Sequence, residues 1–161
     1  MKTKKIFMSI LACLAFTALI AQPQLIEKVE AKPDKVVIAY EKWKLSNGLI
    51  VLLHEDHSDP VVNVMVTYKV GSNRESIGRS GFAHFFEHMM FRGTEKYSKE
   101  KYSEMMKSIG ASANANTSLD RTVYHMTGNA NKLETMFELE SDRFQNLKYS
   151  IQDFKTEAGA V

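Results

Sequence analysis

The sequence predicts an α+β fold in which helices pack on a mainly antiparallel sheet. Three observations favour this class. β-branched runs come first, amphipathic helical segments follow, and then two more strands and further helices. Asn47-Gly48 lies between apolar runs, a strong hairpin signal. With 161 residues, 44% of them hydrophobic, the chain can form one domain or part of a larger one.

Residues 1–21 are typical of a secretory signal. Lys2, Lys4 and Lys5 precede an apolar run that ends in small residues at Ala21. The run is shorter than the roughly 18–20 apolar residues that a transmembrane anchor needs, so we expect cleavage after Ala21 and no stable membrane span in the mature chain. We therefore expect an exported protein of the bacterial periplasm or cell envelope, or a secreted one.

Removing this segment changes the charge and the cysteine content. The chain carries +2 and residues 1–21 hold three lysines and no acid, which leaves −1 and argues against nucleic-acid binding. The one cysteine, Cys13, lies within the signal; a weak lipoprotein-like box ending there leaves its lipidation as an alternative. The mature part has no thiol, so a metal must use His, Asp or Glu.

The first half of the mature chain predicts a linker and four strands. Residues 22–35 are polar with two prolines and are expected to be a linker, and residues 36–40 a strand. The hairpin spans residues 43–53, with φ > 0 expected at both Asn47 and Gly48. The run 61–70 has apolar residues on both faces, which predicts a well-covered strand.

Helices and two further strands follow. A helix is expected over 81–91, another up to Ile109 after an N-cap at Ser98, and strands over 111–118 and 122–127. A helix over 130–147 should begin after Asn129, and a last one at Ser150, which with Asp153 resembles a capping box. Side chains expected to be buried on the first of these helices are Leu133, Met136, Phe137, Phe144 and Leu147. The last helix carries four residues on one face: Ile151, Phe154, Ala158 and Val161.

The helix over 81–91 carries the sequence His-x-x-Glu-His. At about 100° per residue, His84, Glu87 and His88 share one side. The apolar side chains form a stripe on the other side: Phe82, Phe85, Phe86, Met89 and Met90. Histidines at i and i+4 can bind one Zn²⁺, which activates a water molecule, and a neighbouring carboxylate can act as general base. The alternative is a solvated helix face.

The other histidines favour simpler interpretations. His54 and His57 stand among acidic residues before Pro60, as in a surface loop. His125 lies within a predicted strand, where a structural or pocket-wall role is favoured over metal ligation.

Four ordered segments of residues 36–161 resemble the pitrilysin/insulinase family of metallopeptidases, M16, also called inverzincins. GFAHFFEHMMFRGT resembles its zinc helix, SANANTSLDRTVYH its small-residue strand, LETMFELESDRFQNL its Glu-x-Asp-Arg helix, and SNGLIVLLHEDHSDPVVNVMVTYKVGSNRES its N-terminal hairpin and strand. The resemblance implies the LuxS/MPP-like metallopeptidase fold and a Zn²⁺ cofactor.

The resemblance also implies residue roles. His84 and His88 match the zinc ligands, Glu87 matches the catalytic base, and Glu157 matches a glutamate that supports the site. The family's third ligand follows seven residues after Glu157, three beyond Val161, so we expect an N-terminal fragment whose catalytic domain is incomplete. We expect this chain alone to bind zinc weakly and to lack useful activity.

Substrates and partners follow from the same resemblance. The family binds a peptide as an added strand on a sheet edge; Ala113, Asn114 and Ala115 are the matching residues here, although the strand can also be read as internal. A second M16-like domain or subunit should close the chamber. The function expected is a zinc endopeptidase; the alternatives are a non-catalytic M16-like subunit and a zinc-carrying envelope protein without hydrolysis.

Overall fold

The computed structural model describes residues 22–160, which form two compact units that divide after Ser58. The predicted signal peptide, Cys13 and Val161 lie outside the described residues. None of the described helices is long and apolar enough to cross a membrane.

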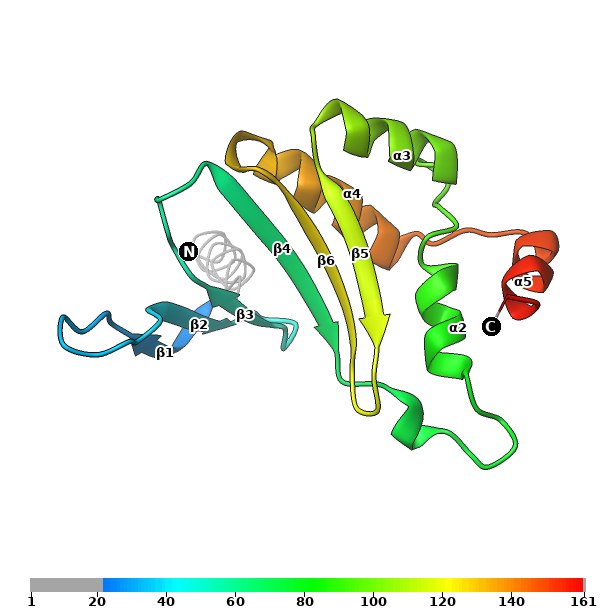
Figure 1. Ribbon diagram of the computed structural model, residues 1–161, viewed down its shortest axis with the longest axis horizontal. Helices are drawn as coiled ribbons and strands as arrows, with labels where there is room; N and C mark the ends of the chain where they lie inside the picture. Colours follow the sequence, from blue (N-terminus) through cyan, green and yellow to red (C-terminus); the bar gives the residue numbers. More distant parts are fainter. Residues whose placement is uncertain (1–21, 161) are drawn as a thin grey trace, which may run out of the picture. The chain divides into compact units, whose positions relative to one another are not determined.

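The first unit is a three-stranded antiparallel sheet, coloured blue to cyan in Figure 1. Its strands are β1 (Gln24–Val29), β2 (Tyr40–Lys44) and β3 (Ile50–Leu53). The predicted hairpin is present as β2–β3, with Trp43 opposite Val51. Its turn differs from the expectation: Gly48 has φ of 87° but no described non-glycine residue has positive φ, so Asn47 does not. The Asn47 side chain instead accepts a hydrogen bond from Leu49 N–H.

Two further expectations for this unit differ from the structure. The range 22–35, expected as a linker, contains β1, which pairs with β2 so that Glu27 lies opposite Lys42 and Lys28 opposite Glu41. The strand expected over 36–40 is wrong: only Tyr40 belongs to a strand, and Val36 and Ile38 are exposed. β-branched composition indicates strand propensity, but a strand also needs a neighbour to pair with.

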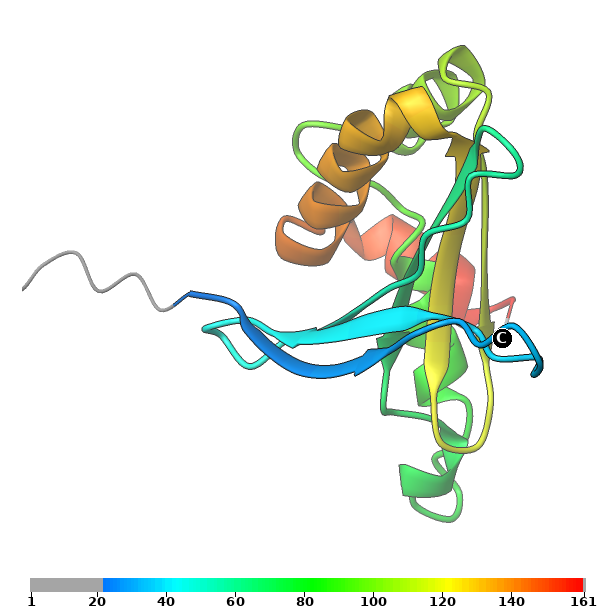
Figure 2. The same ribbon diagram turned by 90° about the vertical axis from the view of Figure 1, so that its left-hand side faces the viewer.

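The second unit packs helices on one face of a sheet with strand order β4-β6-β5 (Figure 2). This confirms the predicted α+β class. Its strands are β4 (Val61–Tyr68), β5 (Ser112–Thr117) and β6 (Thr122–Asn129). Its helices are α2 (Phe82–Met89), α3 (Lys99–Ser108), α4 (Leu133–Gln145) and α5 (Ile151–Ala158), with short 3₁₀ turns η1 (Ser72–Arg74) and η2 (Ala130–Lys132).

Strand register separates the two faces of this sheet. Val64, Met126 and Ala113 form one cross-strand row, and with Met136 and Leu139 of α4 they belong to the hydrophobic core. On the opposite face, the neighbouring row is Met65, His125 and Asn114. Within the second unit, β4 is therefore covered on one face, where Val64 is buried, whereas coverage on both faces was expected.

The α4 helix buries Met136 as predicted, but the rest of its buried side differs from the prediction. Phe137 is exposed, whereas Leu139, Glu140 and Arg143 are buried. Arg143 pairs with Glu140 at 2.5 Å and lies over the rings of Tyr124 and Phe144. Because Glu140 and Arg143 form an ion pair, α4 can bury these two charged residues, which a hydrophobic pattern assigns to the surface.

Gly71 lets the segment after β4 approach the β5–β6 turn. Ser72 N–H donates to Ser118 O at 3.1 Å and Asn73 N–H to Leu119 O at 2.8 Å. A Cβ on Gly71 would lie 2.3 Å from Ser118 O. This contact fixes the start of the segment that leads to α2.

We predict that Gly71→Ala destabilises the protein by about 1–3 kcal/mol, because the backbone must shift to admit the methyl group. Denaturant unfolding measures this change. Gly159→Ala is the matched control, since its Cβ would meet nothing closer than 3.6 Å. Equal stability of the two variants would contradict the close approach.

Candidate metal centre

The helix that carries the two histidines, α2, begins after a glycine in the left-handed backbone conformation. A carboxylate from an earlier segment binds its first amides. Gly81 has φ of 97° and precedes α2. Glu75 accepts hydrogen bonds from Gly81 N–H and Ala83 N–H, both at 2.7 Å. A carboxylate at this end pairs with otherwise unsatisfied amides and complements the helix dipole. Glu75 thus fixes where α2 starts.

The α2 helix lies beside β5 and α5 (Figure 1). Phe85 and Met89 are buried, and the Phe85 ring packs against Phe154 of α5. Phe82 and Phe86, which the sequence assigned to the core stripe, are both 52% exposed. The buried side of α2 is therefore narrower than predicted.

The two histidines direct the same ring nitrogen at one another. Their Nε2 atoms are 3.0 Å apart, and the ring planes meet at 82°. Two nitrogen ligands of a tetrahedral Zn²⁺ stand about 3.3 Å apart, given bonds of 2.0–2.1 Å. The spacing and the nitrogen donors therefore fit one zinc ion. No group of three His, Cys, Asp or Glu suited to a metal occurs within residues 22–160.

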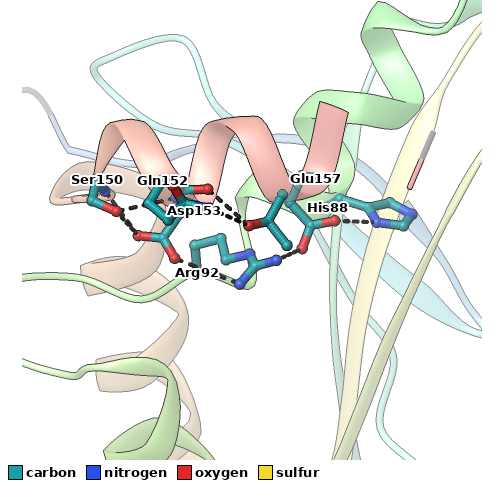
Figure 3. Close-up of polar contacts among 7 residues, drawn as sticks. His88, Arg92, Ser150, Gln152, Asp153 and Glu157 are labelled. Carbon is teal, nitrogen blue, oxygen red and sulfur yellow. Dashed lines mark hydrogen bonds and ion pairs between the residues drawn. The ribbon is translucent and has the colours of Figure 1, made fainter. Parts of the chain in front are cut away.

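Glu157 reaches this pair from α5, whose predicted capping box of Ser150 and Asp153 is present. Its Oε2 lies 2.8 Å from His88 Nδ1, and its Oε1 pairs with Arg92 (Figure 3). Burial acts to raise the pKa of Glu157, but the hydrogen bonds from His88 and Arg92 outweigh it, and the pKa lies below its ordinary value. Glu157 therefore faces His88 as a carboxylate.

Glu87 is buried against the sheet, although the sequence placed it on the polar side of α2. The residue is 9% exposed, and its carboxylate accepts a hydrogen bond from the Thr117 hydroxyl of β5. Thr117 Oγ1 is 3.3 Å from Thr122 Oγ1, which donates to Val70 O at 3.0 Å. Burial, and then the charge of Glu87, raise the pKa of Tyr124 to about 12. The Glu87 side chain thus contacts the sheet through Thr117 and is largely shielded from solvent.

The strand expected to bind substrate is an edge of its three-stranded sheet. In β5, Ala113 and Ala115 are partly buried and Asn114 is exposed. Asn114 Oδ1 accepts a hydrogen bond from Ala115 N–H at 2.9 Å. Thr117, on the same strand and the same face as the two alanines, reaches Glu87.

The remaining histidines have other surroundings. His54 contacts Ala39 O at 2.6 Å, and His57 is exposed beside Glu55. His125 lies on β6, on the sheet face opposite the core row.

Three residues around the site were not predicted from the sequence: Glu75, Arg92 and Thr117. Arg92 follows His88 by four residues, a spacing that could have indicated a shared side of the helix. Thr117 and Glu75 contact α2 through tertiary folding, for which no local pattern exists.

Comparison with known proteins gives one consistent result. Residues 50–161 match Insulinase (Peptidase family M16). The chain is 32% identical to Zinc protease PqqE of Helicobacter pylori over 76% of this chain and 28% of that protein. It is 36% identical to the mitochondrial-processing peptidase subunit beta of Lentinula edodes over 65% of this chain and 22% of that protein.

A solved structure shares the fold. The crystal structure of pitrilysin superposes with a TM-score of 0.72 at 27% identity, over 86% of this chain and 15% of that one. The chain thus spans less than a third of each of these relatives.

We predict that Glu75→Ala destabilises the protein by about 1–2 kcal/mol, because two amides at the start of α2 lose their acceptor. Thermal unfolding should show a melting temperature lower by several degrees. Glu104→Ala, at an exposed position of α3, is the control and should have little effect. A Glu75→Ala protein as stable as this control would refute the capping role.

Proposed function

Because the chain belongs to the insulinase family, peptidase family M16, we propose that it is the N-terminal part of a zinc-dependent endopeptidase. The observation that carries this proposal is the meeting of two histidine Nε2 atoms at 3.0 Å, on the helix that also bears Glu87. We propose His84 and His88 as ligands, with a third ligand seven residues after Glu157, and therefore propose that this chain is a fragment.

Bound Zn²⁺ would polarise the scissile carbonyl and lower the pKa of a water molecule. Glu87 is the proposed general base: its carboxylate takes a proton from the attacking water and passes it to the leaving amine. The Thr117 hydroxyl holds one oxygen of this carboxylate and so orients it. Glu157 keeps a hydrogen bond on His88 Nδ1, which leaves Nε2 as the ligating nitrogen.

The proposed substrate is a peptide that pairs with the edge of β5 at Ala113, Asn114 and Ala115. Small side chains at the two alanines let another backbone approach. Thr117 lies two residues after Ala115 and contacts Glu87, so a peptide along this edge would run toward the proposed base. Asn114 would have to release Ala115 N–H for that amide to bind the peptide.

We further propose that a second M16-like domain or subunit completes the protease, and that residues 1–21 direct export to the periplasm or cell envelope, or secretion. The mitochondrial-processing peptidase relative is named as a subunit, which fits the proposal of a second domain or subunit.

Metal analysis of the complete protein separates the catalytic proposal from a non-catalytic M16-like subunit, since only the former requires stoichiometric zinc.

We predict that Glu87→Gln in the complete protein lowers peptide hydrolysis by at least about 10²-fold, because the amide cannot accept the water's proton. Zinc content, measured by elemental analysis, should stay unchanged because His84 and His88 remain. Glu104→Gln is the control and should hydrolyse peptides at the wild-type rate. A Glu87→Gln enzyme with normal turnover would show that another residue is the base.

We predict that Thr117→Val, which keeps the shape of the side chain, lowers kcat about tenfold or more with little change in KM. The carboxylate of Glu87 then loses a donor on one side, and its orientation is no longer fixed. Steady-state kinetics on a peptide substrate measures both constants. Thr117→Ser retains the hydroxyl and should restore most of the rate; an equally slow serine variant would exclude the hydrogen bond as the cause.

A further inference from the structure

Arg92 joins the end of α2 to α5. It lies four residues after His88, and its side chain is 15% exposed. Nη2 pairs with Glu157 Oε1, and Nη1 is 3.5 Å from Asp153 Oδ1. Figure 3 shows the guanidinium between these two carboxylates, which stand one helical turn apart on α5. One arginine therefore contacts both acidic side chains.

Both oxygens of Glu157 are engaged as a result. Oε1 faces Arg92, and Oε2 faces His88 Nδ1 at 2.8 Å. A carboxylate can rotate about its last bond, but a donor fixed on one oxygen limits the directions open to the other. The side chain of Glu157 is 13% exposed, so water offers few competing partners.

We propose that Arg92 is a positioning residue of the metal site. By holding Oε1 of Glu157, it keeps Oε2 on His88 Nδ1, and this fixes the ring nitrogen Nε2 of His88 toward His84. The hydrogen bond on one nitrogen of a histidine determines which nitrogen is left as a ligand. The binding of zinc by Nε2 rests on the proposed function. The orientation of the His88 ring by Arg92 does not depend on that function.

A plain salt bridge between two helices is the competing explanation. Pairs of this kind contribute little net stability, because two charges lose water when they are buried. Arg92 Nε is also buried without a hydrogen-bond partner in the part of the chain that the structure describes. This arrangement is therefore expected to add little stability. The planar guanidinium, which distinguishes arginine from lysine, can instead contact Asp153 and Glu157 at the same time and fix the direction of the Glu157 carboxylate.

The test compares the metal-free wild-type protein with Arg92→Leu and Arg92→Lys at about pH 8, where histidine side chains are ordinarily neutral. Long-range ¹⁵N–¹H NMR identifies the protonated nitrogen of the His88 ring. We expect a proton on Nδ1 in the wild type, and a shift of population toward Nε2–H in Arg92→Leu. Arg92→Lys should show the same shift in part, and it keeps the test valid if the leucine variant fails to fold.

Zinc affinity, measured by competition with a chromophoric chelator, gives a second readout. Arg92→Leu should bind zinc about tenfold more weakly than the wild type. Arg121→Leu is the matched control, because Arg121 is exposed and pairs only loosely with Asp120, at 3.8 Å. It should leave both readouts unchanged.

The outcomes separate the two proposals. An unchanged His88 proton position in both Arg92 variants, with zinc affinity within about twofold of the wild type, would overturn the positioning role. A wild-type ring whose Nδ1 proton depends on Arg92, in a protein that binds no zinc, would support the positioning role and count against the proposed function alone.

Discussion

The hydrogen bond between His88 and Glu157 is the contact on which the candidate site depends. It joins α2 to α5 across 69 residues of sequence. Without it, the His88 ring could turn about its side-chain bonds, and the 3.0 Å approach of its Nε2 to His84 would be one arrangement among several. The packing of Phe85 on Phe154 brings the two helices together, but an apolar contact does not fix the orientation of an imidazole ring.

Three different neighbours hold α2, and each acts on a different part of it. Glu75 binds the first amides, β5 reaches Glu87 through Thr117, and α5 reaches His88 through Glu157. An eight-residue helix is too short to be stable alone, so its position depends on these contacts. His84 has the most exposed position of the three polar residues, which leaves a side of the pair open to a ligand.

Local patterns in the sequence predict the elements well and their surroundings poorly. The Ser150–Asp153 capping box, the hairpin and the start of α3 at its N-cap Ser98 follow from interactions within a few residues. Periodicity also places both histidines on one side of α2, but it cannot show which neighbour covers each side. Phe86 was therefore expected in the core and Glu87 on the surface, whereas β5 covers Glu87 and Phe86 is exposed. β1 was missed for a related reason. Its residues form a strand because they pair with β2, and their composition alone does not indicate this pairing.

The surroundings of the two carboxylates argue for two different roles. Glu157 has a cation on one oxygen and a histidine on the other, and these two contacts hold its carboxylate against α2. Glu87 accepts a hydrogen bond on Oε2 from a neutral hydroxyl, and no cation contacts it among the described residues. A general base must exchange a proton, and a nearby arginine would make that proton harder to accept. Glu87 is therefore suited to the proposed proton transfer, and Glu157 to holding His88, the proposed ligand, in place.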